Sequence, residues 1–214
     1  MKSVLVIGMG RFGLHLAQKM TELGNEVMIV DKDPDIINEL SSRFSDSMIG
    51  DCTDESVLEE IGVEDFDICF VTMGTQYSSA VEITSILKDL GAKKIVVKAG
   101  RDRHTKILKK LGADDIVYPE REMAEHLAVK YSSNSIFDFI KLGDDFAVYE
   151  INVPKNWIGK SIGGLDVRKK HNMNIIAIKS FGEICSSVLP TYVFRECDNI
   201  IVVGKEEDFK KYLK

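Results

Sequence analysis

The sequence contains few cysteines and no long run of apolar residues. The four cysteines are Cys52, Cys69, Cys185 and Cys197. None of them forms the Cys-x-x-Cys pair that is typical of zinc and redox sites, so we expect free thiols in a reducing compartment. No apolar run approaches the roughly 18–20 residues that a membrane-spanning helix requires. We therefore expect no membrane span in this chain.

The sequence also lacks the excess of positive charge that is typical of nucleic-acid-binding proteins. Lys and Arg total 28 against 34 Asp and Glu, a formal net charge of -6. This balance argues against a nucleic-acid partner, because such proteins usually carry a basic face. The four histidines stand at no metal-ligand spacing, and we interpret them as structural. No Ser–His–Asp or Cys–His set indicates a nucleophilic enzyme.

Residues 1–119 instead alternate short apolar runs with helical patterns. The runs are rich in Val and Ile and are mostly apolar on both faces, as buried parallel strands are. They span residues 4–7, 27–30, 68–72, 95–98 and 116–118. Helices are predicted over residues 12–23, 34–44, 56–61, 77–90 and 105–111. This order predicts an α/β fold with a Rossmann-type doubly wound parallel sheet, and a ligand crevice at the carboxyl ends of its strands.

The pattern changes after Glu120. A helix is predicted from there to about residue 133, where a Ser- and Asn-rich cluster at 132–135 marks a boundary. Beyond it, strands are predicted over 146–153, 175–179 and 199–203, and helices over 162–171 and 206–213. We predict a Rossmann nucleotide-binding domain at 1–119, a crossover helix and linker at 120–134, and a small α+β ligand or dimerisation domain at 135–214. The first predicted strand begins at about residue 3, so we expect no signal peptide and a cytoplasmic protein.

A glycine-rich turn with the spacing Gly-x-Gly-x-x-Gly follows the first predicted strand. Gly8 permits the tight turn, Gly10 lets the backbone approach a phosphate, and Gly13 lets the next helix pack on the strand. The second predicted strand ends at Asp31, roughly 20 residues later, where this fold places the acid that binds ribose hydroxyls. The alternative is that Asp31 or Asp33 only caps the helix predicted from Pro34. These features predict an adenosine-nucleotide site, and ATP/ADP and NAD/NADH remain alternatives for it.

Further side chains at the same sheet edge extend the candidate site. Arg11 begins the first helix and can bind phosphate oxygens in bidentate fashion, the alternative being a solvated side chain. Lys98 and Arg101 follow a later strand and can add positive charge near the phosphates, or can simply be surface charges. The remaining candidates for the cofactor site are Phe12, Lys32, Asp51, Cys52, Met73 and Gly74.

The ordered set of motifs resembles the regulator-of-potassium-conductance proteins, also called KTN proteins. The matching features are the acid Asp31 and the stretches 8–13, 50–53, 97–99, 112–120, 159–168, 175–178 and 198–204. The resemblance implies a cytosolic gating subunit, not an enzyme, of a Trk/Ktr potassium uptake system. It also implies a homo-oligomer, with dimers assembling into a ring of eight beneath a membrane potassium-translocating partner. The rival interpretations are an NAD(H)-binding redox sensor and an NAD-dependent oxidoreductase. Only about 80 residues follow the crossover helix and linker, at 135–214, which argues against the enzyme.

The same resemblance implies roles for particular residues. It places Asp51 and Cys52 beside the adenine ring, and it lets Glu120 help hold a divalent cation such as Mg²⁺ or Ca²⁺ near the phosphates. The alternative for Asp51 and Cys52 is a turn that only caps the following helix. The alternative for Glu120 is a glutamate in the first turn of a helix that complements the helix dipole. In the second domain it implies a cyclic di-AMP site, with simple dimer packing as the alternative. The residues of that site would be Ile162, Arg168, Asn174, Ile175 and Pro190.

Overall fold

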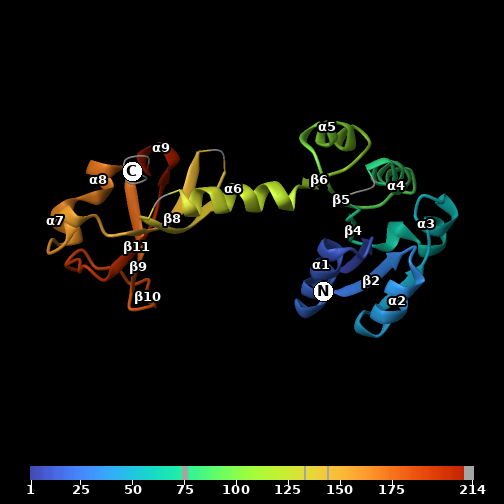
Figure 1. Ribbon diagram of the computed structural model, residues 1–214, viewed down its shortest axis with the longest axis horizontal. Helices are drawn as coiled ribbons and strands as arrows, with labels where there is room; N and C mark the ends of the chain where they lie inside the picture. Colours follow the sequence, from blue (N-terminus) through green and yellow to red (C-terminus); the bar gives the residue numbers. More distant parts are fainter. Residues whose placement is uncertain (74–76, 133, 144, 210–214) are drawn as a thin grey trace. The chain divides into compact units, whose positions relative to one another are not determined.

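The computed structural model describes residues 1–73, 77–132, 134–143 and 145–209 (Figure 1). The chain divides into two compact units, Met1–Glu120 and Arg121–Lys214. Each unit has a buried apolar core of its own.

The first unit is built on a six-stranded sheet with the order β3-β2-β1-β4-β5-β6. Every neighbouring pair runs parallel. The strands are β1 (Ser3–Ile7), β2 (Glu26–Asp31), β3 (Asp46–Ile49), β4 (Ile68–Val71), β5 (Ile95–Lys98) and β6 (Asp115–Val117). The chain winds outward from β1 in one direction and then from β4 in the other. The point between β1 and β4 is therefore the switch point at which ligands bind in such sheets.

The alternation of side chains along β1 explains why its sequence is apolar throughout. Val4 and Val6 pack into one cluster with Ala17 of α1 (Arg11–Glu22) and with α2 (Pro34–Leu40). Leu5 and Ile7 pack into a second cluster on the other face. That cluster receives side chains from α3 (Glu55–Ile61), α4 (Tyr77–Asp89) and α5 (Asp102–Lys110). Helices thus cover both faces of the sheet, which confirms the doubly wound architecture predicted from the sequence.

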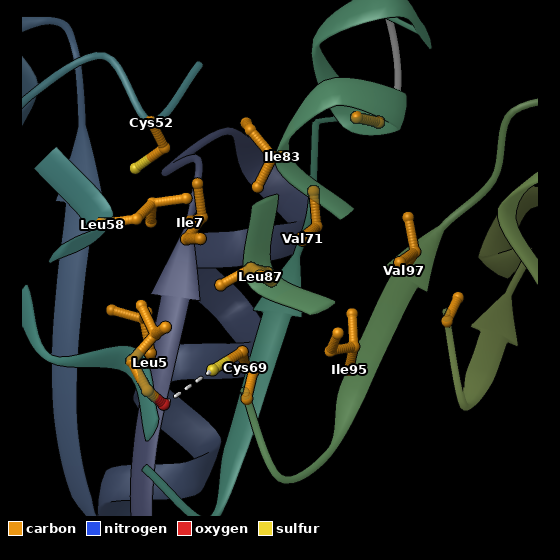
Figure 2. Close-up of a cluster of buried hydrophobic side chains, with 14 of the residues drawn as sticks. Leu5, Ile7, Cys52, Leu58, Cys69, Val71, Ile83, Leu87, Ile95 and Val97 are labelled. Carbon is orange, nitrogen blue, oxygen red and sulfur yellow. Dashed lines mark hydrogen bonds between the residues drawn. The ribbon is translucent and has the colours of Figure 1, made fainter. Parts of the chain in front are cut away.

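Figure 2 shows the second cluster, in which side chains of β1, β4 and β5 meet those of α3 and α4. The thiol of Cys69 donates a long hydrogen bond of 3.9 Å to the carbonyl oxygen of Val63, in the short 3-10 helix η2 (Val63–Asp65). A second short 3-10 helix, η1 (Ser41–Arg43), follows α2 directly. The helix predicted over residues 34–44 therefore ends as a tighter 3-10 turn.

The second unit is a small α+β domain, as the sequence predicts. The helix α6 (Pro119–Tyr131) leads into a five-stranded antiparallel sheet with the order β10-β9-β11-β8-β7. Its strands are β7 (Ile136–Lys141), β8 (Phe146–Asn152), β9 (Met173–Ser180), β10 (Glu183–Cys185) and β11 (Asp198–Lys205). The short helices are η3 (Lys155–Trp157), α7 (Ile162–Leu165), α8 (Val167–His171) and α9 (Glu206–Phe209). Trp157 and Phe194 are among the largest side chains in its core.

The structure corrects the sequence prediction at three places in this unit. The helix predicted over residues 162–171 is two short helices, because Asp166 adopts the left-handed conformation with φ of 49°. The strand β7 was not predicted, since a bulge between Ile136 and Asp138 disturbs the alternating pattern that marks a strand. The edge strand β10 is exposed at every residue, so it lacks that pattern altogether. The helix predicted over residues 206–213 appears as α9, and its residues from 210 lie outside the described part of the chain.

A buried carboxylate organises the edge of the second unit's core. Asp198 is 1% exposed and accepts hydrogen bonds from the hydroxyl of Tyr192 at 2.8 Å, the backbone N–H of Arg195 at 2.8 Å and the hydroxyl of Ser180. Burial by itself would raise the pKa of this carboxyl. The three hydrogen bonds outweigh burial and hold the pKa of Asp198 below its ordinary value.

We predict that Asp198→Asn destabilises the second unit in a pH-dependent way. The native pKa lies below the unfolded value of about 3.9, so the carboxylate stabilises the fold above that value. At pH 7 the change should lower the free energy of unfolding by about 1.5–3 kcal/mol, as expected for hydrogen bonds to a charged group. The difference from wild type should shrink as the pH falls below 4 towards the native pKa, because the wild-type carboxyl then takes up a proton.

Urea unfolding followed by the fluorescence of Trp157 measures this, because Trp157 is the single tryptophan and lies in this core. Glu183→Gln, on the exposed strand β10, is the control and should change little. If Asp198→Asn lowers the free energy of unfolding equally at pH 7 and at low pH, the prediction is wrong.

Candidate functional site

The first unit contains a cleft of about 920 Å³ whose wall is formed largely by the carboxyl ends of its strands and the start of α1. This volume lies within the range that small-molecule sites usually occupy. The wall consists of Ile7, Gly8, Gly10, Arg11, Phe12, His15, Val30, Asp31, Lys32, Gly50, Asp51, Cys52, Thr72, Met73, Lys98, Gly100, Tyr118 and Glu120.

The turn after β1 is fixed by hydrogen bonds to the end of β2. Gly8 has φ of +94°, a backbone conformation that residues with a side chain rarely adopt. Its N–H donates to the carbonyl of Val30 at 2.8 Å. The carboxylate of Asp31 accepts from the N–H of Met9 at 2.6 Å and from the N–H of Asp33 at 3.0 Å. Asp31 therefore holds the turn in addition to facing the cleft.

Two further glycines of the motif have different roles. Gly10 is the N-cap of α1, with no side-chain cap, and a Cβ built there would meet no atom within 4 Å. The first N–H groups of α1 are thus left for an anion in the cleft. A Cβ on Gly13 would overlap the carbonyl oxygen of Gly8 and would lie 2.5 Å from the hydroxyl oxygen of Thr72. Gly13 therefore permits close packing of α1 on the turn and does not line the cleft.

Lys98 and Glu120, which both line the cleft, form an ion pair. The Lys98 ammonium lies 2.7 Å from a carboxylate oxygen of Glu120 and 5.4 Å from the ring centre of Phe12. The Lys98 side chain is 12% exposed, whereas that of Glu120 is 63% exposed. The hydrogen bond from Lys98, with a smaller contribution from Arg11, holds the pKa of Glu120 below its ordinary value. Glu120 is thus ionised, and it neutralises Lys98.

The loop after β3 supplies an acid and a thiol. Hydrogen bonds from the hydroxyl and the N–H of Thr53, at 2.8 and 3.1 Å, lower the pKa of Asp51. Cys52 is 3% exposed, and burial together with the charges of Asp51 and Asp31 raises its pKa to about 12. The thiol of Cys52 is therefore neutral and offers a small apolar surface to a bound ligand.

The structure brings most of the predicted cofactor residues into one wall. These are Gly8, Gly10, Arg11, Phe12, Asp31, Lys32, Asp51, Cys52, Met73, Lys98 and Glu120. Arg101 precedes α5 and is not in the wall, and Gly74 lies outside the described residues. Whether the wall residues bind a ligand stays a prediction.

The wall also contains residues that the sequence analysis missed. They are Ile7, His15, Val30, Gly50, Thr72, Gly100 and Tyr118. His15 stands four residues after Arg11 on α1, and this helical spacing could have placed it in the wall. Thr72 directly follows β4, and the rule that parallel strands end at one edge could have identified it too.

The candidate residues of the second unit contact each other in part. The Nε of Arg168 donates to the side-chain oxygen of Asn174 at 2.6 Å. Pro190 lies beside the start of α7, because its carbonyl accepts from the N–H of Gly163 at 2.8 Å. Ile162 and Ile175 pack against the core of this unit.

The described residues contain neither a metal-binding cluster nor a membrane-spanning helix. No group of His, Cys, Asp and Glu in that part of the chain is arranged to hold a metal ion by itself. No helix there has both the length and the apolar character needed to cross a membrane.

Comparisons with known proteins match both units. Residues 4–119 match the TrkA-N domain and residues 147–214 match the TrkA-C domain. The chain is 40% identical over 213 residues to the Ktr system potassium uptake protein C of Bacillus subtilis (strain 168), covering 100% of this chain and 96% of that protein. It is 33% identical over 211 residues to the Ktr system potassium uptake protein A of the same organism, covering 99% of this chain and 95% of that protein.

Solved structures show the same fold at low sequence identity. The RCK domain of GsuK superposes with a TM-score of 0.71 and 17% identity, over 99% of this chain and 47% of that chain. The GsuK channel bound to NAD superposes with a TM-score of 0.70 and 17% identity, over 97% of this chain and 38% of that chain. The present chain thus spans less than half of the length of these two structures.

We predict that the four cysteines divide into two reactive and two unreactive thiols. Cys185 and Cys197 are exposed, whereas Cys52 and Cys69 are buried and burial raises the pKa of each to about 12. Because the thiolate is the reactive form, the buried pair should react far more slowly at pH 8. A thiol reagent such as DTNB should therefore titrate two thiols rapidly in native protein and all four in denaturant.

The variants Cys185→Ser and Cys52→Ser identify which cysteines react rapidly and which react slowly. The first should remove one fast thiol and the second one slow thiol. Rapid reaction of Cys52 in the folded protein would contradict the burial and charge that we describe for it.

Proposed function

The chain belongs to the family of TrkA-N and TrkA-C domain proteins that includes the Ktr potassium uptake proteins, and from this premise we propose its function. We propose that it is the nucleotide-sensing regulatory subunit of a potassium uptake system. In this proposal it binds ATP or ADP and controls a separate membrane protein that carries the potassium. The proposed location is the inner face of the cell membrane, reached through that partner.

The cleft at the strand ends carries this proposal. Asp31 stands at the end of β2, where a carboxylate can accept hydrogen bonds from ribose hydroxyls. Arg11 and the uncapped start of α1 stand beside the glycine turn, where they can bind phosphates. We assign nucleotide binding to residues 1–119, the connecting helix and linker to 120–134, and dimerisation with a small ligand to 135–214. A solved GsuK structure bound to ADP and another bound to NAD have this fold, so NAD or NADH is the alternative nucleotide.

We also propose that a divalent cation accompanies the phosphates. Mg²⁺ and Ca²⁺ prefer oxygen ligands. The protein offers the exposed carboxylate of Glu120 in the cleft wall, so the nucleotide would supply the other ligands of the cation. A cation there would draw Glu120 away from Lys98, and the Lys98 ammonium would then be free to bind a phosphate oxygen.

An exposed apolar stripe supports the proposal that the chain assembles with copies of itself. Met123, Leu127 and Tyr131 recur every four residues on α6 and are 56%, 43% and 78% exposed. Such a stripe on a helix usually packs against another surface. We propose a homo-oligomer in which dimers form a ring of eight. A single-chain mass in light scattering, with and without nucleotide, would contradict it.

The second unit is proposed to bind a separate ligand at a two-fold axis between copies. Arg168 can bind a phosphate, and Asn174 can bind an adenine edge. The hydrogen bond between them brings both to one place. Cyclic di-AMP is two-fold symmetric and carries both groups, and calorimetry with the full chain tests it. Absence of heat would leave this unit as a dimerisation module.

We predict that Asp31→Ala weakens every adenosine ligand together. The loss of a charge-assisted hydrogen bond costs about 1.5–3 kcal/mol, or about 10- to 100-fold in affinity. Calorimetric titration with ATP, ADP, NAD⁺ and NADH measures this, and the wild-type ranking identifies the preferred nucleotide. Asp46→Ala, at the exposed start of β3, is the matched control. If Asp31→Ala binds these nucleotides with wild-type affinity, Asp31 does not bind the ribose hydroxyls.

We predict that Arg11→Ala narrows the difference between ATP and ADP affinity and leaves ADP affinity nearly unchanged. In a ring, Arg11 of one subunit would reach the terminal phosphate bound by its neighbour, and only ATP has that phosphate. A coupling of about 1–3 kcal/mol is typical of linked sites. Lys19→Ala is the control, since Lys19 is on the same helix and pairs with Glu22.

Potassium flux into vesicles that hold the membrane partner provides the second measurement. Arg11→Ala should abolish the stimulation by ATP, whereas Lys19→Ala should retain it. Equal weakening of ATP and ADP would instead make Arg11 a ligand of the inner phosphates in its own subunit. Unchanged binding and flux would exclude it from the switch.

A further inference from the structure

Thr72 holds the glycine-rich turn from the side of β4. It follows that strand directly, is 7% exposed and forms part of the cleft wall. Its N–H donates to the carbonyl of Ile7 at 2.9 Å, which continues the pairing between β4 and β1. Its hydroxyl lies 3.1 Å from that same carbonyl oxygen and also bonds to the carbonyl oxygen of Gly8. Since a hydroxyl has one proton to donate, two successive carbonyls share it.

The opposite side of the turn is held from β2. The N–H groups of Gly8 and Met9 donate to the carbonyl of Val30 and to the carboxylate of Asp31. The carbonyls of Ile7 and Gly8 thus accept hydrogen bonds from the residue that follows β4. The N–H groups of Gly8 and Met9 donate hydrogen bonds to the end of β2. Every polar backbone group from the Ile7 carbonyl to the Met9 N–H is therefore bonded within the protein.

The position of the Thr72 hydroxyl also depends on the third glycine of the motif. A Cβ on Gly13 would lie 2.5 Å from this hydroxyl oxygen and would overlap the Gly8 carbonyl. The hydroxyl and the carbonyl therefore occupy the space beneath the first turn of α1 that the missing side chain leaves. A carbonyl held there does not present its lone pairs to an anion in the cleft, which it would otherwise repel.

We propose that Thr72 is a positioning residue for the phosphate-binding turn. Its hydroxyl holds the carbonyls of Ile7 and Gly8 beneath α1, and this leaves the N–H groups at the start of α1 as the polar groups that meet a phosphate. Thr72 acts through the backbone of the turn and does not itself bind the nucleotide. This role deepens the proposed function and rests on it for the ligand, although the effect on the turn is independent of any ligand.

The test compares a variant that lacks the hydroxyl with one that keeps it. Thr72→Val removes the hydroxyl and retains a β-branched side chain, and Thr72→Ser retains the hydroxyl. Thr84→Val is the matched control, because Thr84 is fully buried in α4, and its hydroxyl likewise donates to a backbone carbonyl, that of Ala80. Thr72→Ala is a second variant without the hydroxyl, in case Thr72→Val does not fold.

Two measurements on the full chain are needed. The first is hydrogen exchange of the Gly8 and Met9 amides without nucleotide, which reports opening of the turn. The second is the affinity for ADP by calorimetry. We expect Thr72→Val to exchange these amides about tenfold faster and to bind ADP about tenfold more weakly, the scale of one lost hydrogen bond. Thr72→Ser should stay within about twofold of wild type in both measurements.

Thr84→Val should lower the melting temperature as Thr72→Val does, without changing amide exchange in the turn or ADP affinity. Wild-type exchange and affinity in Thr72→Val would overturn the proposal, and so would the same changes in Thr84→Val. If wild-type protein fails to bind ADP, the nucleotide function is wrong. Amide exchange of Gly8 and Met9 then still decides whether Thr72 holds the turn.

Discussion

The close packing of the glycine turn between β2 and β4 is the constraint on which the rest of the first unit depends. The Gly8 carbonyl fits beneath α1 only because Gly13 has no side chain. The N–H of Met9 reaches the carboxylate of Asp31 only because β1 and β2 pair in parallel and end together. The same contacts fix where α1 starts, and so they place its free N–H groups in the cleft wall.

Charged side chains of both signs line the cleft. Asp31 is the last residue of β2 and Asp51 follows β3, whereas Arg11 and Lys98 come from α1 and β5. Lys98 is neutralised by Glu120, the second residue of α6. An anion that binds Lys98 would compete with the carboxylate of Glu120. The Lys98 ammonium is therefore a contact common to the cleft and to the start of α6. In general, a ligand shifts an equilibrium between two states of a protein only through contacts that differ between those states.

The second unit depends on a different kind of interaction. Its last strand, β11, pairs with β8 and β9, which lie well before it in the chain, and the buried Asp198 ties Tyr192 and Arg195 to the start of β11. Arg168 and Asn174 meet because Asn172, in the left-handed conformation, turns the chain from α8 into β9. The apolar side chains of the α6 stripe are exposed, so this helix has an apolar face outside the core of the unit.

The sequence by itself determined the features that depend on local patterns. The apolar runs predicted five of the six strands of the parallel sheet, all but β3, and the glycine spacing with Asp31 predicted the cleft, because strand periodicity and turn chemistry act over a few neighbouring residues. Tertiary structure alone decided the break at Asp166, the irregular strand β7, and the pairing of Lys98 with Glu120. It also decided that Thr72 meets the glycine turn, although 64 residues separate it from Gly8. Such contacts follow from the order in which strands pair, and no local pattern encodes that order.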